Sequence, residues 1–325
     1  MQTLQLTGPR RFSNVHLPIP PIRDDGAGKL LVKLQWALVC GSDVSKFAGA
    51  NRDSQFPLLP GMPLHECVGQ DITSTTEAFR PGEWVVAIPE GEQGLSEFFV
   101  ALDSQAIQLP LELVDCDASP LIQPLSTVIY GIDRLGSVEG HSVTVVGLGA
   151  IGLLFCWLFK QRGAKSITGV DPCQDRCEVA VRLGADKTFP MRSADLVETI
   201  HQKARNLELP DIVVEAVGHQ TETINDCLSL VQQQGTVLAF GVPDQDIYPL
   251  AFEVFFRKNA HLIAAVTPDW SKYLPLAQEI FSAHHQELKQ LVTHRFPIRQ
   301  SQHAFTLYEN HAPGLIKALL DASAW

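Results

Sequence analysis

The sequence lacks several features that would assign it to a specialised class of protein. None of its apolar runs approaches the roughly 20 residues needed to span a bilayer. Residues 1–11 have neither the apolar core nor the small-residue cleavage site of a signal peptide. Positive charge is in deficit, since 25 Lys and Arg face 36 Asp and Glu. We therefore expect a soluble, cytoplasmic protein with a small-molecule substrate and with no nucleic-acid or membrane partner.

Cysteine is also too sparse and irregular for a disulfide-stapled scaffold. Seven cysteines are scattered over 325 residues, an odd number without the close spacing of a disulfide framework. We expect reduced thiols, one of which is available to a metal. The chain is 45% hydrophobic and longer than the roughly 250 residues at which single cores stop growing, so two domains are expected.

The pattern of apolar residues changes near Ser126. Before Pro124, short alternations, as in Val32, Leu34 and Trp36 on one face, predict an antiparallel β domain. From His141, solid apolar strands alternate with amphipathic helices, which indicates a doubly wound parallel sheet. The predicted strands cover 142–146, 167–171, 212–216, 236–240 and 262–265, and the first two helices cover 151–162 and 174–183.

The last part of the chain is expected to return to the first domain. After Pro268 the pattern becomes helical, and then predicts a strand over 292–296 and a helix from Ser301. The predicted domains are therefore 1–125 with 268–325, and 126–267.

A glycine-rich turn follows the first strand of the second domain. Its sequence offers a tight turn, a close backbone approach to a pyrophosphate and close packing of helix on strand. The helix N-terminus would supply free N–H groups to that anion. The residues of this turn that we expect to bind the cofactor are Gly147, Gly149, Ala150, Ile151 and Gly152.

Asp171 ends the next predicted strand, 19 residues after Gly152. Its carboxylate would bind the adenosine ribose and repel a 2′-phosphate, which favours NAD(H) over NADP(H). Arg176 is placed to cover the ribose, although an exposed arginine is the equally good alternative. Later strand ends contribute Val217, Gly218, Gly241 and Val242 as supporting cofactor contacts.

Three residues of metal-binding type lie in the first domain. Cys40 precedes Gly41, Ser42 and Asp43, and His65 and Glu66 follow 25 residues after the cysteine. A thiolate, an imidazole and a carboxylate are ligands that Zn²⁺ accepts, and a catalytic site needs only three of them. Taken singly, Cys40 is more often a buried thiol and His65 a core histidine, whereas Glu66 is costly to bury without a partner.

With these motifs in order, the chain resembles the zinc-containing medium-chain dehydrogenases, in particular their sorbitol and polyol branch. The resemblance runs from the cysteine segment and His65–Glu66 through 121–126 to 292–296. It implies a GroES-like β-rich catalytic domain joined to a Rossmann domain. It also implies that Cys40 and His65 ligate one catalytic zinc, with Glu66 as a direct or alternating third ligand.

The resemblance implies roles for three further residues. Ser42 takes the substrate proton, and Asp43 orients His65, as carboxylates beside metal-bound imidazoles do. Gln123 stands where the polyol branch usually has Glu, so it is either a metal, water or substrate contact or a plain boundary residue before a proline.

The chain departs from the family pattern at three places. No cysteine lies between Cys67 and Cys116, where relatives carry a four-cysteine lobe, so no structural zinc is expected. The usual glycine before the His-Glu pair is Leu64, and Ser45-Lys46 replaces the histidine that often follows the cysteine segment.

These observations predict a zinc-dependent, NAD-linked alcohol dehydrogenase acting on a secondary alcohol or ketone, such as a polyol, cyclitol or sugar-like compound. Two alternatives stay open: a zinc-free enone or quinone reductase of the same fold, and a non-catalytic NAD-binding sensor. An exposed edge strand around 262–266 predicts a homodimer.

Overall fold

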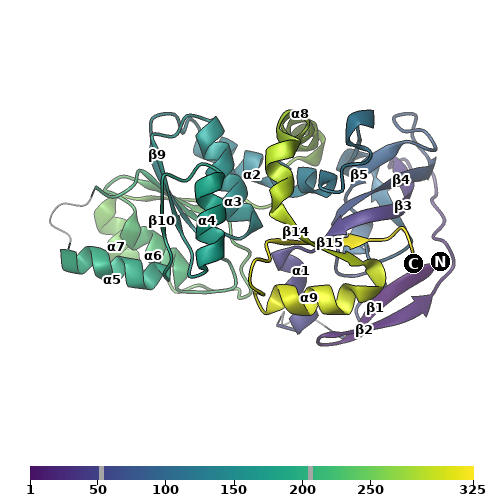
Figure 1. The fold of residues 1–325 in the computed structure, drawn as a ribbon, viewed down its shortest axis with the longest axis horizontal. Coiled ribbons are helices and arrows are strands. Elements are labelled where there is room, and N and C mark those ends of the chain that lie inside the picture. The colour runs from purple at the N-terminus through teal and green to yellow at the C-terminus, as the bar shows by residue number, and fades with distance from the viewer. Residues whose placement is uncertain (51–54, 204–207) are drawn as a thin grey trace. The chain divides into compact units, whose positions relative to one another are not determined.

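The computed structural model describes residues 1–50, 55–203 and 208–325, which form two compact units (Figure 1). The first unit comprises Met1–Ser126 and Asp269–Trp325, and the second comprises Thr127–Pro268. Helix α2 (Ile122–Leu135) begins in the first unit and ends in the second. No helix in the described ranges is both long and apolar enough to cross a membrane.

The first unit is rich in β-structure. Its elements are β1 (Gln2–Gly8), β2 (Arg11–His16), β3 (Lys29–Leu38), α1 (Gly41–Ala48), β4 (Glu66–Ser74), β5 (Trp84–Ala87), η1 (Glu90–Glu92), β6 (Phe98–Leu102), η2 (Asp103–Gln105), β7 (Ala106–Gln108), η3 (Leu111–Leu113), η4 (Ser119–Leu121), α8 (Trp270–Leu288), η5 (Lys289–Leu291), β14 (Val292–Pro297), η6 (Ile298–Gln300), α9 (Ser301–Glu309) and β15 (Lys317–Asp321). The sheet order is β14-β15-β3-β4-β5-β7, β6 also pairs with β3, and β1 and β2 form a hairpin. The C-terminal strand β15 therefore lies directly beside β3.

A β-bulge in β3 corrects one prediction from the sequence. Val32 and Leu34 are buried in the core, but the pairing with β4 shifts register between Leu34 and Trp36. Such a bulge reverses the face that later residues present. Ala37 therefore enters the core, while Trp36 stacks on Trp84 with ring centroids 6.1 Å apart.

Helix α1 is fixed in the first unit by aromatic packing. Phe47, on this helix, is fully buried and its ring lies 5.5 Å from that of Phe12 and 5.2 Å from that of Phe305 on α9. Offset and tilted ring contacts of this kind add to the free energy gained by burial. The start of α1, where Cys40, Ser42 and Asp43 lie, is thereby held on a rigid support.

The second unit is a doubly wound parallel sheet. Its elements are β8 (Ser142–Val146), α3 (Ala150–Gln161), β9 (Ser166–Val170), α4 (Gln174–Arg182), β10 (Lys187–Phe189), α5 (Ser193–Lys203), β11 (Ile212–Glu215), α6 (Thr223–Leu230), β12 (Thr236–Ala239), α7 (Phe252–Lys258) and β13 (His261–Ala264). The order β10-β9-β8-β11-β12-β13 is that of a dinucleotide-binding Rossmann sheet. The α/β fold class, a GroES-like β-rich unit plus a Rossmann unit, is thus confirmed.

Candidate metal centre and cofactor site

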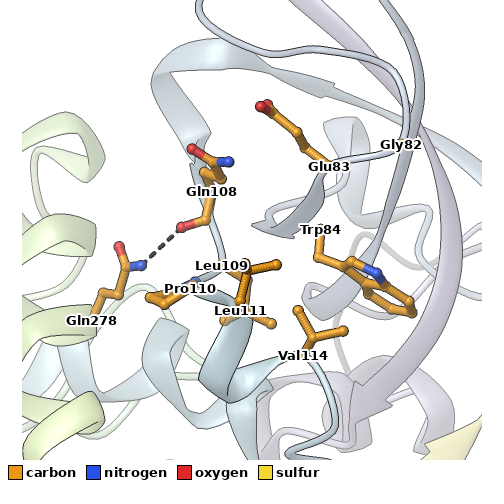
Figure 2. A pocket seen from close by; sticks show the side chains of 9 residues that line it. All are labelled: Gly82, Glu83, Trp84, Gln108, Leu109, Pro110, Leu111, Val114 and Gln278. Carbon is orange, nitrogen blue, oxygen red and sulfur yellow. Dashed lines mark hydrogen bonds between the residues drawn. The ribbon is translucent and has the colours of Figure 1, made fainter.

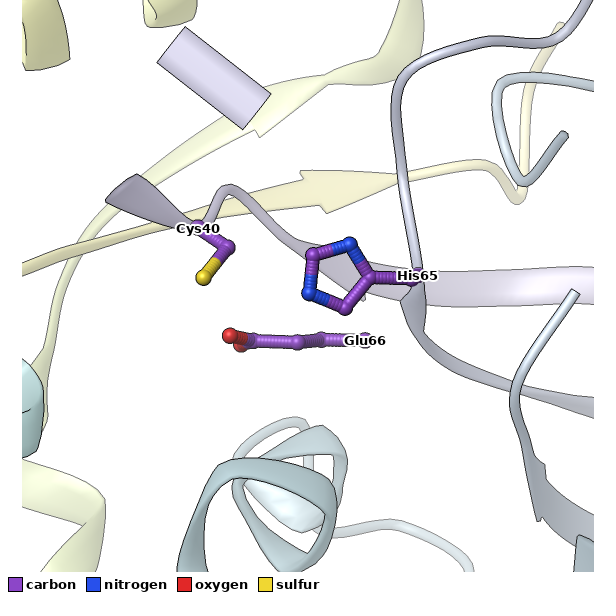
Figure 3. Close-up of side chains that lie close together, drawn as sticks. All are labelled: Cys40, His65 and Glu66. Carbon is purple, nitrogen blue, oxygen red and sulfur yellow. The ribbon is translucent and has the colours of Figure 1, made fainter. Parts of the chain in front are cut away.

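Cys40, His65 and Glu66 come together in the first unit. Each offers a ligand atom, and these atoms all lie within 4.8 Å of one another. Figure 3 shows the three side chains converging on one space. Cys40 is the residue before α1, and Glu66 begins β4 directly after His65. The pairing of β3 with β4, in which Leu38 lies opposite Glu66, brings the two segments together.

Asp43 links the two segments. One carboxylate oxygen accepts a hydrogen bond of 2.8 Å from the backbone N–H of Cys40, and the other lies 3.0 Å from Nδ1 of His65. Burial alone would lower the pKa of His65, but the charge of Asp43 and the nearby Cys40 raise it well above its usual value. With Nδ1 facing Asp43, Nε2 of the imidazole is left to serve as a ligand.

The charge of Glu66 is balanced by a lysine that was not among the predicted site residues. Lys317 Nζ donates to both carboxylate oxygens of Glu66 at 2.6 and 2.7 Å, and to the carbonyl of Val39 at 3.1 Å. The side chain of Lys317 is 1% exposed and that of Glu66 is 0% exposed. Burial lowers the pKa of Lys317, but the charge of Glu66 more than offsets this and raises it.

A signal for Lys317 was present in the sequence. It is a lone cation inside the apolar run 315–320, where a buried charge needs a partner of opposite sign. The sequence does not say which of the 36 acidic residues is that partner, because the contact spans 251 residues.

Ser42 and Gln123, two other predicted site residues, lie in the first turns of helices. Ser42 is half-buried on α1, and its carbonyl accepts a hydrogen bond from Ser45. Gln123 is buried at the start of α2, directly after η4, which packs against β3 and β4. The segment that carries Gln123 is therefore anchored on the two strands that bring the metal-binding residues together.

Leu64, which replaces the usual glycine, is accommodated in the core. Its side chain is fully buried in the hydrophobic cluster of the first unit. Its N–H donates to the carbonyl of Glu92 at 2.9 Å, and its carbonyl accepts from Gly94 at 3.1 Å. The segment before His65 is therefore held by the short turn that follows β5.

The glycine-rich turn has the form expected of a pyrophosphate site. Gly147 has φ 91°, and a Cβ there would meet the backbone of Ala216 at 2.9 Å. A Cβ on Gly152 would lie 1.8 Å from the carbonyl oxygen of Gly147, so close packing of α3 requires glycine. At Gly149 a Cβ would meet nothing within 4 Å. This space lies at the N-terminus of α3, where Ala150 and Ile151 begin the helix.

Asp171 supports the same turn from the end of β9. One carboxylate oxygen accepts from the N–H of Leu148 and the other from the N–H of Cys173, both at 2.8 Å. Arg176 on α4 places a guanidinium nitrogen 3.8 Å from the carboxylate. Asp171 is therefore a structural partner of the glycine-rich turn, a role that its position in the sequence does not predict.

Glu215, at the end of β11, is a second missed residue. Its buried carboxylate accepts hydrogen bonds of 3.0 Å from the backbone of Val217 and Gly218 and from the hydroxyl of Thr223. A Cβ on Gly241 would lie 2.2 Å from the nitrogen of Gly218. The strand ends that carry the four predicted contacts Val217, Gly218, Gly241 and Val242 thus pack tightly around one carboxylate.

A separate cavity in the first unit contains none of the predicted site residues. Its volume is about 380 Å³, and Figure 2 shows Gln278 donating a hydrogen bond to the carbonyl of Gln108 beside it. The lining residues are Gly82, Glu83, Trp84, Gln108, Leu109, Pro110, Leu111, Val114 and Gln278. This cavity lacks groups with which to do redox chemistry, so the metal-binding triad is the better candidate site.

Comparison with known proteins agrees with this geometry. A family described as zinc-binding dehydrogenase matches residues 150–282. A sorbitol dehydrogenase from Gallus gallus is 26% identical, and the match covers 91% of this chain and 90% of that protein. A D-arabinitol dehydrogenase from Uromyces fabae is 25% identical over 75% of this chain and 76% of its own length.

Solved structures share the fold at lower identity. An alcohol dehydrogenase from Thermus superimposes with a TM-score of 0.84 at 22% identity, covering 99% of this chain and 100% of that one. A galactitol-1-phosphate dehydrogenase from Escherichia coli superimposes with a TM-score of 0.81 at 19% identity, covering 99% of this chain and 100% of that one. An Escherichia coli alcohol dehydrogenase complexed with NADH superimposes with a TM-score of 0.84 at 20% identity, covering 99% of both chains.

Proposed function

We propose that this chain, which is similar to zinc-containing medium-chain dehydrogenases and to sorbitol dehydrogenases among them, transfers a hydride between NAD(H) and a secondary alcohol or ketone. The substrate class proposed is a polyol, cyclitol or related sugar-like compound. The observation that carries the proposal is the convergence of Cys40, His65 and Glu66 within 4.8 Å.

The donor set fits one zinc ion. Cys40 and His65 would supply sulfur and nitrogen, which are the preferred ligands of zinc, and Glu66 or Gln123 would supply oxygen. Glu66 has both oxygens on Lys317, so its use as a ligand requires it to share or leave that partner. When bound, zinc would act as a Lewis acid on the substrate oxygen, and NAD⁺ would accept the hydride.

Residues of the chain would orient the His65 ligand and accept the hydroxyl proton of the substrate. Asp43 holds His65 in one orientation, because its carboxylate faces Nδ1. Ser42 would accept the hydroxyl proton of the substrate as the carbinol loses its hydride. Ketone, NADH and one proton are the products, and Ser42, which is half-buried, would release its own hydroxyl proton to solvent as it accepts that of the substrate.

The second unit would bind NAD(H) rather than NADP(H). The open space at Gly149 and the free helix N-terminus suit a pyrophosphate. Asp171 would accept hydrogen bonds from the ribose and would repel a 2′-phosphate, with Arg176 covering the ribose. Val217, Gly218, Gly241 and Val242 would line the nicotinamide half, as strand ends of this fold do.

A homodimer is the proposed assembly. Strand β13 ends the parallel sheet, and unpaired edges are usually covered. Large apolar side chains are exposed on β13 and in the segments that flank it in sequence, among them Phe252, Phe256, Leu262 and Val266. A second copy of the chain, placing its own β13 against this edge, would bury them.

Metal content tests the proposal most directly. Purified wild type should contain one zinc per chain and bind NADH more tightly than NADPH. Cys40→Ala should lose the zinc and the dehydrogenase activity while it keeps NADH binding, because the cofactor residues lie in the other unit. One zinc also agrees with the proposed absence of a structural zinc.

A well-folded, NADH-binding wild type without zinc would overturn the metal mechanism. Reduction of an enone or quinone by that protein would identify it as a zinc-free reductase of the same fold. NADH binding without turnover on either panel would point to a sensor.

A further inference from the structure

An ion pair between Lys46 and Glu92 joins the helix that follows Cys40 to the turn that is hydrogen-bonded to Leu64, the residue before His65, and it has no role in the mechanism above. Lys46 Nζ contacts Oε2 of Glu92, and the side chains are 21% and 38% exposed. Lys46 follows Ser42 by four residues on α1, so the two share one face of the helix. Lys46 therefore lies one helical turn beyond Ser42, whose hydroxyl is proposed to take the substrate proton.

Glu92 approaches the same region from the segment that holds His65. Its carbonyl accepts the hydrogen bond from Leu64, the residue before that ligand. Its φ of 58° lies in the left-handed region, which is uncommon for residues other than glycine. Such a conformation costs free energy and tends to persist where it places a functional group.

The pair places hydrogen-bond donors and hydrogen-bond acceptors side by side. An ammonium has three donors and a carboxylate two acceptor oxygens, so one mutual contact leaves capacity for more. A hydroxyl group both donates and accepts, and so it can bind the two partners together. A substrate without that hydroxyl would displace water from the pair without replacing the lost hydrogen bonds, which strongly disfavours its binding.

We propose that Lys46 and Glu92 together bind a second hydroxyl group of the substrate and thereby select polyols and cyclitols over monohydric alcohols. The proposal rests on the proposed function, because it assigns a specificity to the same site. It makes Lys46 and Glu92 specificity residues, distinct from the residues that would hold the metal or move the proton.

The test compares matched alcohols with Lys46→Met, Glu92→Gln and wild type. The pairs are myo-inositol with cyclohexanol and D-sorbitol with 2-hexanol, which share a ring or a chain and differ in added hydroxyls. Lys160→Met is the control, since Lys160 lies 3.8 Å from Asp186 in the second unit with both side chains about half exposed. Zinc content and melting temperature are measured for each variant, and only folded, zinc-loaded variants are compared.

In wild type, kcat/KM should favour the polyhydric member of at least one pair. Each site variant should lose about 10- to 100-fold on that member and less than about 3-fold on its monohydric partner, as expected for the loss of hydrogen bonds to charged groups. Lys160→Met should change neither. A wild type without polyhydric preference, or an equal loss on both members, would overturn the proposal.

Failure of the proposed function gives a different result. If wild type turns over none of the four compounds, calorimetric titration of the same compounds into the NADH-bound protein replaces kinetics. Polyhydric binding that falls at least 10-fold in Lys46→Met and not in Lys160→Met would support the role of the pair. Equal or undetectable binding in wild type would reject it.

Discussion

At the scale of single residues, the candidate metal centre contains two buried carboxylates that each face a partner of opposite or potential positive charge. Asp43 faces His65 and the backbone of Cys40, and Glu66 faces Lys317. A buried pair adds little net stability by itself, but removal of one partner leaves an uncompensated charge. The metal-binding region therefore depends on residues that bind no metal.

Replacement of Lys317 by Met should expose this dependence. Glu66 would lose both of its hydrogen bonds in a site that is 0% exposed, and the free energy of unfolding should fall by about 3–5 kcal/mol. Urea unfolding of metal-free protein measures the loss. The double variant Glu66→Leu with Lys317→Met should recover at least half of it, since neither charge then remains. A double variant as unstable as the single one would show that packing, and not charge, is responsible.

At the same scale, the sequence pointed to the three candidate metal ligands, which the structure brings together, but not to the residues that support them. Cys40, His65 and Glu66 were recognisable because their side chains have the chemistry of zinc ligands. Lys317 and Glu92 were not, because their partners are set by strand pairing and loop contacts between distant segments. Long-range contacts of this kind are decided by the fold and leave only weak local signals.

At the scale of elements, the strand ends of the second unit are tied by one carboxylate. Glu215 accepts from Val217, Gly218 and Thr223 at 3.0 Å each. Asp211, at the other end of the same strand, binds the backbone and hydroxyl of Ser142 at 2.7 and 2.6 Å. The two acidic residues thus hold opposite ends of β11.

Glu215→Ala should weaken NADH binding by about 10-fold, because the loops that carry Val217 and Gly218 lose their common acceptor. Glu215→Gln keeps one acceptor oxygen and should lose less. Asp211→Asn is the matched control and should lower stability with little change in NADH affinity. Titration of NADH fluorescence measures each dissociation constant. An equal loss of affinity in Asp211→Asn would mean that general loosening of the sheet is the cause.

Periodicity predicted most elements of the second unit but failed where the pattern was short or interrupted. The five predicted strands are present with ends shifted by about one residue. The sixth, β10, has three residues with a lysine and a threonine, which is too short for a two-residue alternation to stand out. In β3, the bulge between Leu34 and Trp36 changed the face of Trp36. Bulges depend on the partner strand and cannot be inferred from one strand alone.

At the scale of the whole molecule, the exposed edge at β13 is the basis of the proposed homodimer. Phe256 on α7 is 68% exposed and Val266, just after β13, is 70% exposed. Such side chains gathered at an open sheet edge favour association with a second copy.

Phe256→Glu should raise the dissociation constant of the dimer at least 10-fold, because a charge would be buried in the interface. Sedimentation velocity over a range of concentrations measures the shift. Val181→Glu is the control, since Val181 on α4 is 52% exposed and α4 packs beside β9 and β10 at the other side of the sheet. Dimers that survive Phe256→Glu, or a monomeric wild type, would contradict the proposed interface.

The distance in sequence between Glu66 and Lys317 has a consequence for synthesis of the chain. The two residues are 251 positions apart, so a ribosome needs roughly 12–50 s to reach the lysine after it has placed the glutamate. During that interval the nascent chain already carries Cys40, His65 and Glu66, but the carboxylate has no counter-charge and β3 lacks its neighbour β15. We therefore expect the candidate metal centre to assemble only after residue 317 has been synthesised, and fragments that end before it would carry Cys40, His65 and Glu66 without the lysine and the strand that support them.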